Sequence, residues 1–276
     1  MPEYAVLDKD TIKIWIMPNL SVAKRGFTTK FDMIEIVNSI LYKLKSGCQW
    51  RMLPVGHLFT GEPPSWNTVF HHYRKWSKAG EWKATFTELL SKNKDKVDLS
   101  LSHIDGSHTP VYRGGEKAAY QGRKKRNTTN ALFLSDRNGL PLAMSEPQAG
   151  NHTDVFEIDD RVEEMMRQLK DAGISTDGLF SNLDAGFDAK ELRMALDGHG
   201  VISNVCPNRR NGCDSSEEHL FDEEMYKERW TVERTNAWMD GFRAVLARFD
   251  TTVSSWKGWN YLAFIVIFLK KFHKSK

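Results

Sequence analysis

Residues 179–186 read Leu-Phe-Ser-Asn-Leu-Asp-Ala-Gly, a short apolar segment that ends in Asp184. Residues 99–106, Leu-Ser-Leu-Ser-His-Ile-Asp-Gly, repeat the pattern and end in Asp105 beside Gly106. Glycine lets a backbone and a ligand approach closely, and carboxylates at strand ends are typical of active sites in α/β sheets. A single aspartate of this kind is more often a turn residue. Two of them, each ending an apolar strand, predict a shared site at one edge of a sheet.

The segments around these aspartates alternate between strand and helix patterns. Strands are expected at 99–105, 131–135, 140–146, 179–184 and 201–205. Helical periodicity is found at 155–169, 188–197 and 223–247. Adjacent strands followed by alternating helices and strands predict an α/β domain with a mixed sheet.

The first 97 residues have a helical pattern instead. Apolar residues from Ile34 to Leu44 form a helical stripe that ends at Gly47, and Ser65 is expected to cap a second helix with Arg74 and Lys75 on its polar face. Two such helices favour a helix-turn-helix-like DNA-binding domain, although a plain helical bundle with a solvated charged face fits equally well.

A lysine-rich linker at 91–98 separates this region from the α/β part. The expected division is therefore a helical DNA-binding domain with its linker at 1–97 and a catalytic domain at 98–276. A polar inserted loop is expected around 207–220.

Charge is unevenly spread along the 276 residues. The net charge is +3, but residues 1–97 hold 15 Lys/Arg against 9 Asp/Glu, an imbalance that suits a basic arm on an acidic catalytic body. Three cysteines are too few for a disulfide framework and favour a reducing compartment. The longest apolar run, Leu262 to Leu269, is far below the roughly 20 residues that a membrane span needs, so we expect a buried core helix and a cytoplasmic protein.

The densest basic segment runs from Arg113 to Arg126, where six Lys/Arg accompany one acid. Four consecutive cations close it: Arg123, Lys124, Lys125 and Arg126. Such a run binds DNA phosphates through counterion release, although a solvated hairpin is the simpler alternative. Arg229, Arg234 and Arg243 are further candidates for DNA contact, and Arg229 is also a candidate to steady Glu233.

A third carboxylate, Glu233, lies in the helical segment. Tyr226, Arg229 and Glu233 are spaced i, i+3, i+7 and share one helix face. An Arg229–Glu233 ion pair that stabilises the helix is the simpler explanation of this spacing. Asp154 is an alternative second carboxylate, but its place before a helix favours an N-cap.

The order Asp…Asp…Glu, with Tyr-x2-Arg-x3-Glu around the last, resembles the DDE-class transposases of bacterial insertion sequences, specifically the insertion sequence five group. The resemblance covers most of the chain and is carried by residues 47–54, 66–76, 105–107, 150–154, 184–188, 232–234, Trp238, Phe242, Arg243, Arg248 and Phe249. One position departs from the pattern: the Lys that often follows the Glu by seven residues is Asp240 here, and Arg243 is the nearest positive charge.

The resemblance implies a ribonuclease H-like core with Asp105 on the first strand, Asp184 after the fourth and Glu233 on a later helix. It implies that the three carboxylates are catalytic and hold two Mg²⁺ (or Mn²⁺) ions. These ions activate a water or a 3′-hydroxyl and neutralise the leaving oxygen. The activity implied is endonucleolytic cleavage and strand transfer.

The implied partner is double-stranded DNA, as the terminal inverted repeats of a mobile element and as its target, bound by a homodimer on the bacterial nucleoid. Two alternatives from other classes stay open. One is a domesticated DNA-binding protein without catalysis, and the other is a metal-dependent DNA nuclease without strand transfer.

Overall fold

The computed structural model describes residues 5–22, 30–208 and 221–273. The chain forms two compact units, each built from more than one stretch of sequence. The first unit consists of Met1–Leu89, Tyr112–Glu116 and Trp238–Lys276. The second unit consists of Leu90–Val111 and Lys117–Ala237. Most of the expected polar insertion, residues 209–220, lies outside the described residues.

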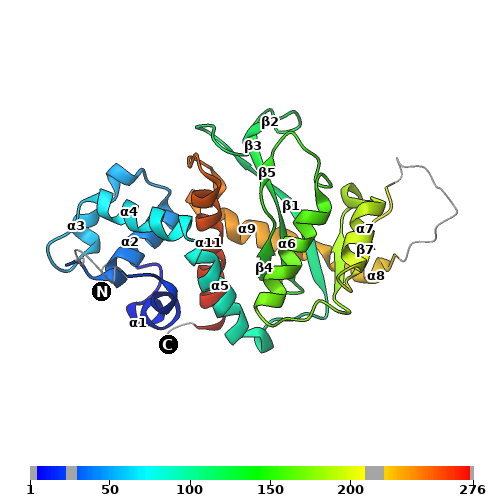
Figure 1. Cartoon of the computed structure of the whole chain (residues 1–276), viewed down its shortest axis with the longest axis horizontal. Helices are drawn as coiled ribbons and strands as arrows, with labels where there is room; N and C mark the ends of the chain where they lie inside the picture. Colours follow the sequence, from blue (N-terminus) through cyan, green and yellow to red (C-terminus); the bar gives the residue numbers. More distant parts are fainter. Residues whose placement is uncertain (1–4, 23–29, 209–220, 274–276) are drawn as a thin grey trace. The chain divides into compact units, whose positions relative to one another are not determined.

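A mixed sheet forms the centre of the second unit (Figure 1). Its strand order is β2-β3-β1-β6-β7, and β4 and β5 also pair with β3. The pairs β2–β3 and β3–β1 are antiparallel, whereas β1–β6 and β6–β7 are parallel. This mixed topology confirms the expected α/β class with a mixed sheet. The strands are β1 (Ser102–Pro110), β2 (Ala119–Gln121), β3 (Arg126–Asp136), β4 (Pro141–Met144), β5 (Gln148–Ala149), β6 (Phe180–Leu183) and β7 (Ile202–Val205).

Helices α6 (Ile158–Asp171) and α7 (Lys190–Asp197) pack against the sheet of this unit. Helix α6 contacts β4, and α7 contacts α6 and β7. The apolar side of α6 is fully buried through residues spaced three and four apart, Val162, Met165, Met166 and Leu169. Helical periodicity predicted both helices, because burial of one face is what produces that pattern.

Asp105 does not end its strand, contrary to the prediction. β1 runs on to Pro110, and its antiparallel register with β3 is continuous from Ser102↔Asp136 to Pro110↔Thr128. The paired register with β6 covers only Ser102 and His103. The strand continues beyond Asp105 because β3 supplies backbone hydrogen-bond partners as far as Pro110. The apolar pattern of one strand cannot reveal this pairing.

In the first unit the helical pattern is confirmed. Helix α2 (Met33–Ser46) ends at Gly47 in the left-handed conformation, φ 66°, and packs against α4 (Trp66–Lys78). The connection between them contains a 3-10 turn, Trp50–Met52, and α3 (Val55–Leu58). A helix-turn-helix joins its helices through a turn of about 3–4 residues, so this pair is helix-turn-helix-like only in having two packed helices.

Two boundaries in this region differ from expectation. Ser65 stands at the N-cap of α4, but its side chain makes no cap hydrogen bond there. The expected linker at 91–98 is partly helical, since α5 (Glu81–Lys92) takes its first two residues and a 3-10 turn, Lys94–Lys96, follows. Lysine is a good helix former, so a run rich in lysine does not by itself indicate a linker.

The long C-terminal helix α11 (Val253–Phe272) completes the core of the first unit. It packs on α4, α2 and α10 (Arg243–Leu246). Tyr73 of α4 stacks on Trp259, with 3.9 Å between ring centroids, and its hydroxyl donates to the Ser255 carbonyl at 2.5 Å. Both rings are fully buried. The apolar run Leu262 to Leu269 is thus core, as expected. Among the described residues, no helix combines the length and apolar character needed to cross a membrane.

The segment 223–247 is broken rather than one helix. It consists of α8 (Glu223–Tyr226), a 3-10 turn (Lys227–Trp230), α9 (Thr231–Asp240) and then α10, whose N-cap residue Phe242 is extended. Gly241 lies at the break between α9 and α10, and glycine is the residue most tolerant of such a change in direction. Glu233 consequently lies in the first turn of α9.

Candidate active site

Asp105 and Asp184 come from neighbouring parallel strands of the second unit. The last paired residues of β1 and β6 are His103 and Asn182, and each aspartate lies two residues further along its strand direction. Asp184 directly follows β6, where its Oδ1 accepts a hydrogen bond from the Gly186 backbone at 2.8 Å. The parallel register therefore brings both carboxylates to the same edge of the sheet.

One arginine lies between the two carboxylates. Nη2 of Arg229 is 3.5 Å from Oδ1 of Asp105 and 3.4 Å from Oδ2 of Asp184. The side chains of Arg229 and Asp105 are only about one-fifth exposed (21% and 20%), whereas that of Asp184 is 42% exposed. In the described part of the chain, Arg229 thus forms its ion pairs with the aspartates instead of the expected pair with Glu233.

Burial makes Asp105 an unusual carboxyl group. Removal from water raises its pKa to about 6; Arg229 opposes this rise, and the nearby charge of Asp184 adds to it. Asn236 of α9 donates to Oδ2 of Asp105 at 3.4 Å. A perturbed carboxyl beside a second carboxylate and a buried cation is the arrangement that functional sites show.

Glu233 lies on the helical face that contains the two residues touching Asp105. It follows Arg229 by four positions and precedes Asn236 by three, so the three side chains share one side of the segment. Its side chain is exposed. Within residues 5–22, 30–208 and 221–273, no three His, Cys, Asp or Glu side chains are grouped closely enough to hold a metal ion. The structure therefore brings Asp105 and Asp184 together through Arg229 and leaves Glu233 exposed on the same face of the helical segment as Arg229 and Asn236.

The donors present fit a hard divalent cation. Two carboxylates converge on one point, and that point is taken by the positive guanidinium of Arg229. Oxygen ligands of this kind are those that Mg²⁺ and Mn²⁺ prefer. Two aspartates that already hold one cation between them supply the negative charge that a metal ion requires.

The neighbouring Glu228 is engaged elsewhere. Arg137 donates to it through Nε at 2.8 Å and through Nη2 at 2.5 Å, a bidentate pair. This pair also lowers the pKa of Glu228, chiefly through the hydrogen bond from Arg137. Glu228 is therefore a structural partner of the loop after β3, and Glu233 is the better candidate for a third carboxylate.

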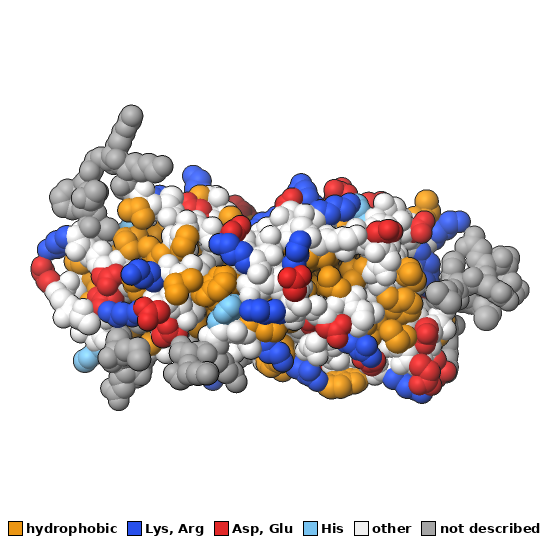
Figure 2. Space-filling view, turned by 90° about the horizontal axis from the view of Figure 1, so that it is seen from below, with side chains coloured by type: hydrophobic (Ala, Val, Ile, Leu, Met, Phe, Trp, Pro, Cys, Tyr) orange, Lys and Arg blue, Asp and Glu red, His pale blue; other side chains and the backbone are white. Residues whose placement is uncertain are grey.

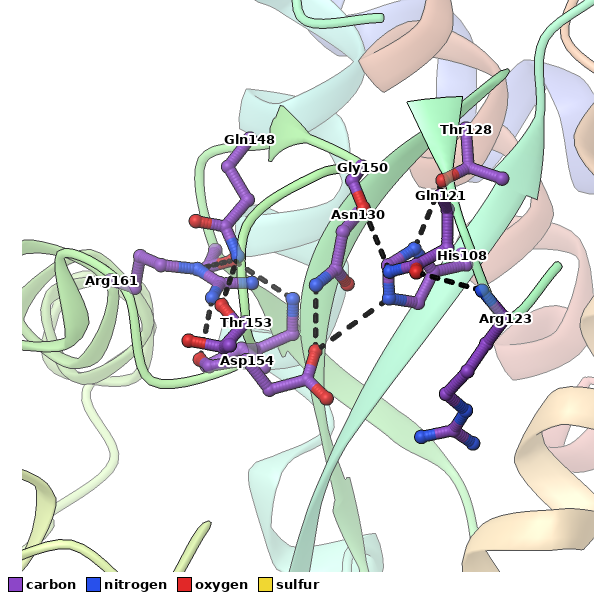
Figure 3. A network of polar contacts seen from close by, with 12 residues as sticks. His108, Gln121, Arg123, Thr128, Asn130, Gln148, Gly150, Thr153, Asp154 and Arg161 are labelled. Carbon is purple, nitrogen blue, oxygen red and sulfur yellow. Dashed lines mark hydrogen bonds and ion pairs between the residues drawn. The ribbon is translucent and has the colours of Figure 1, made fainter. Parts of the chain in front are cut away.

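Asp154 does not cap a helix, contrary to the prediction. The N-cap of α6 is Glu157, in a left-handed conformation. Asp154 instead accepts a hydrogen bond from the Asn130 side chain at 2.6 Å and lies 4.0 Å from His108, as Figure 3 shows. His152, in the same loop, stacks on Phe156 with 3.8 Å between ring centroids.

This polar network ties the β2–β3 hairpin to the loop after β5. Gln121 donates to the Gly150 carbonyl at 2.8 Å, and Thr128 shares a hydrogen bond with Nδ1 of His108 at 3.0 Å. Gly106 lies directly against this network, since a Cβ added there would be 2.5 Å from Oδ1 of Asp154. The close approach of the Asp154 carboxylate to β1 therefore favours glycine next to Asp105.

The predicted basic residues are exposed at the tip of this hairpin. Arg123, Lys124, Lys125 and Arg126 all have exposed side chains. The Arg123 side chain extends away from the network while its backbone donates to Gln121 (Figure 3). A fixed hairpin base with exposed cations is suited to contact a phosphate backbone.

The remaining basic candidates are distributed over both units. Arg234 stacks over Trp230 at 4.8 Å and donates to the Asn138 carbonyl. Arg74 and Arg243 are exposed, and Lys75 donates to the Ser21 carbonyl at 3.1 Å. Basic and acidic side chains of the described residues are interspersed on the face drawn in Figure 2.

Sequence reasoning missed Asn236 and the pair His108 and Asn130. Asn236 was detectable, because it lies one turn beyond Glu233 on the same face. His108 and Asn130 face each other across β1 and β3, in the register His108↔Asn130. Nothing in a single sequence gives that register.

Two family models match the chain. Residues 15–86 match a family described as a transposase of the IS4/5 family, and residues 98–268 match the family described as "Transposase DDE domain". No curated relative matches.

Solved structures of the Mos1 mariner transposase are similar at a low level. Its catalytic domain has a TM-score of 0.29 and 14% identity, covering 67% of this chain and 88% of that one. Its paired-end complex with the left transposon end has a TM-score of 0.28 and 15% identity, covering 88% and 80%. Scores this low add nothing to the assignment, which the family models carry over most of the chain: the protein belongs to the DDE transposases of the IS4/5 kind.

Proposed function

We propose that this DDE transposase binds the terminal inverted repeats of its mobile element, cleaves the DNA there and transfers the cut strand to target DNA, with Asp105, Asp184 and Glu233 as catalytic carboxylates. The observation that carries the site assignment is the convergence of Asp105 and Asp184 on the guanidinium of Arg229. Glu233 is included because it lies between Arg229 and Asn236 on the helix face from which both of these residues contact Asp105.

The three carboxylates would hold two Mg²⁺ or Mn²⁺ ions. When bound, such ions activate the attacking hydroxyl and neutralise charge on the leaving oxygen. The chain's own residues prepare the site. Arg229 keeps the pKa of Asp105 lower than burial alone would make it, and Asn236 orients Oδ2 of the same carboxylate. A ligand must be deprotonated to bind a metal, so Arg229 favours the competent form.

DNA contact is assigned to the basic residues named above. The hairpin residues Arg123 to Arg126 bind phosphates next to the catalytic unit's sheet. Arg229 lies between Asp105 and Asp184, Arg234 follows Glu233 in α9, and Arg74, Lys75 and Arg243 belong to the first unit. Two inverted repeats are related by twofold symmetry, which favours a homodimer. We place the reaction in the bacterial cytoplasm, where the chromosome is accessible.

The test is cleavage of labelled DNA that carries the repeats flanking the gene, with Mg²⁺ or Mn²⁺ present. Asp105→Asn and Asp184→Asn should each abolish cleavage and leave DNA binding within about threefold. Mn²⁺ binding, followed by paramagnetic resonance of the free ion, should weaken in both variants. Cleavage that persists in either variant would remove that residue from the site.

The other two functions correspond to different results of the same assay. Binding without cleavage by the parent chain indicates a domesticated DNA-binding protein. Cleavage without joined products indicates a nuclease. Either result rejects strand transfer.

A further inference from the structure

A cavity of about 810 Å³ opens within the first unit. Four separate parts of the chain line it: the end of α2 and the turn after it with Trp50 and Arg51, the start of α4 with Trp66, the segment 112–116 with Arg113, and the segment before α11 with Phe249 and Asp250. Ligand pockets of drug-sized molecules span about 300–1,000 Å³, a range that includes a single nucleotide. All the lining residues belong to the first unit, whereas the proposed catalytic carboxylates belong to the second.

Aromatic rings form part of the lining. Phe249 is 55% exposed and stacks on Tyr112, itself 61% exposed, with 5.2 Å between centroids and 13° between planes. Trp50 is half-buried and held by Tyr73 and Trp259, at centroid distances of 5.4 and 5.8 Å. Large exposed aromatic surface in a hollow marks a binding site. Phe249 and Trp50 therefore offer ring faces to a planar ligand.

The charges around these rings are mainly positive. Arg51 is exposed, with its guanidinium 5.8 Å from the ring centre of Trp66, and Arg113 is exposed. Lys43 lies deeper: its ammonium is 5.0 Å from the Trp50 ring and donates to the Cys48 carbonyl at 3.0 Å. The two arginines are thus placed to meet a negative group at the opening.

Asp250, the single carboxylate of the cavity lining, is hydrogen-bonded to a residue of the core. Asp250 accepts a hydrogen bond from Nε1 of Trp259 at 3.0 Å. Burial raises its pKa, and Lys43 and Arg248 counteract that rise through their charges. Asp250 therefore offsets the buried lysine and does not cancel the charge of Arg51 and Arg113.

We propose that this cavity binds one unpaired nucleotide of a DNA strand, with its base on the rings of Phe249 and Trp50 and its phosphate at Arg51 and Arg113. Rings and arginines together are how proteins hold single-stranded nucleic acid. A base inside a duplex has both faces covered by its neighbours, so only a base outside the stack can use these rings. The inference rests on the proposed function in that it takes DNA as the ligand.

The experiment measures binding to the full chain carrying Asp105→Asn, so that cleavage plays no part. The probe is a ten-nucleotide oligothymidine with a central 2-aminopurine, and a blunt duplex is the comparison. Phe249→Ala is the main variant because its ring is exposed and its loss spares the core. Phe249→Tyr keeps the ring face, and Arg113→Ala removes one cation.

The parent should quench 2-aminopurine on binding, because stacking on a ring quenches it. Phe249→Ala should weaken oligothymidine binding about tenfold or more and restore the fluorescence, with duplex affinity changed less than about threefold. Phe249→Tyr should behave as the parent. Met52→Ala is the matched control, since Met52 is 70% exposed in the Trp50–Met52 turn and does not line the cavity.

Equal affinity of Phe249→Ala and the parent for oligothymidine overturns the proposal. So does an equal loss for oligothymidine and duplex, which would mean a general backbone contact. These results are independent of the proposed function: a chain that binds the unpaired base but never cleaves repeat DNA rejects transposition and keeps the pocket. A chain that cleaves and joins DNA while Phe249→Ala binds normally rejects the pocket alone.

Discussion

Nη2 of Arg229 lies 3.5 Å from Oδ1 of Asp105, yet burial still raises the pKa of that carboxyl to about 6. The folded chain therefore keeps a proton on Asp105 up to about pH 6, whereas the unfolded chain releases it near the ordinary value of 3.8. Because the unfolded state binds fewer protons between these values, folding stability falls as pH rises through this window. The ionised site is a cost to the fold in the absence of metal.

Asp105→Asn should accordingly stabilise the metal-free protein above pH 7, by about 1–3 kcal/mol. The gain should disappear below about pH 4, where the parent is protonated in both states. Urea denaturation at pH 8 and at pH 4 in the presence of a chelator measures the difference. Asp95→Asn, at an exposed position, should change stability by less than about 0.5 kcal/mol at either pH. A destabilised Asp105→Asn at pH 8 would contradict this account.

Two glutamates five residues apart should separate cleavage from stability. Glu233→Gln is expected to abolish cleavage with little effect on unfolding, because its side chain is exposed. Glu228→Gln is expected to keep cleavage and lose up to about 1 kcal/mol of stability through its Arg137 pair. Cleavage assays and thermal unfolding of both variants give the answer. An active Glu233→Gln together with an inactive Glu228→Gln would show that Glu228, and not Glu233, is the third catalytic carboxylate.

Gly106→Ala should be costly although it adds one methyl group. Its Cβ would lie 2.5 Å from Oδ1 of Asp154, an atom held by Asn130. Overpacking of this kind destabilises proteins by about 1–3 kcal/mol. Gly56→Ala is the matched control, since no atom lies within 4 Å of its added Cβ. Adding Asp154→Ala to Gly106→Ala should recover part of the loss, and strictly additive losses would show that the two residues do not meet.

The hairpin cations should govern the salt dependence of DNA binding. Arg123→Ala with Lys124→Ala should weaken binding and reduce the slope of log affinity against log salt by about 1–2. Arg74→Ala with Lys75→Ala tests the first unit in the same titration. Lys78→Ala, at the exposed end of α4, is the control. An unchanged slope for either pair removes that pair from the DNA interface.

Local patterns predicted most of the secondary structure. The apolar stripe before Gly47 and the strand before Asp184 both have their expected form, because burial of one face or of a whole strand leaves a direct trace in sequence. Asp105 was placed near Asp184 correctly, although its strand was expected to end there. The end of that strand depends on β3, which is distant in sequence.

Pairings between distant segments were not predictable. Arg229 has Glu233 four residues away, and helix spacing favours that neighbour, yet the sheet offers it two aspartates. Asp154 has the position of an N-cap but meets Asn130 through strand register. The cavity of the first unit is assembled from segments around Trp50, Arg113 and Phe249, which periodicity treats separately.

The stacking of Tyr73 on Trp259 has a consequence for how the protein is made. Helices α2 and α4 leave the ribosome early, but the helix that buries Tyr73 is synthesised almost two hundred residues later. The first unit cannot close its core while the intervening sheet is being translated. Nascent chains interrupted before Trp259 therefore expose these aromatic surfaces to chaperones and proteases, and the first unit is complete only in finished molecules.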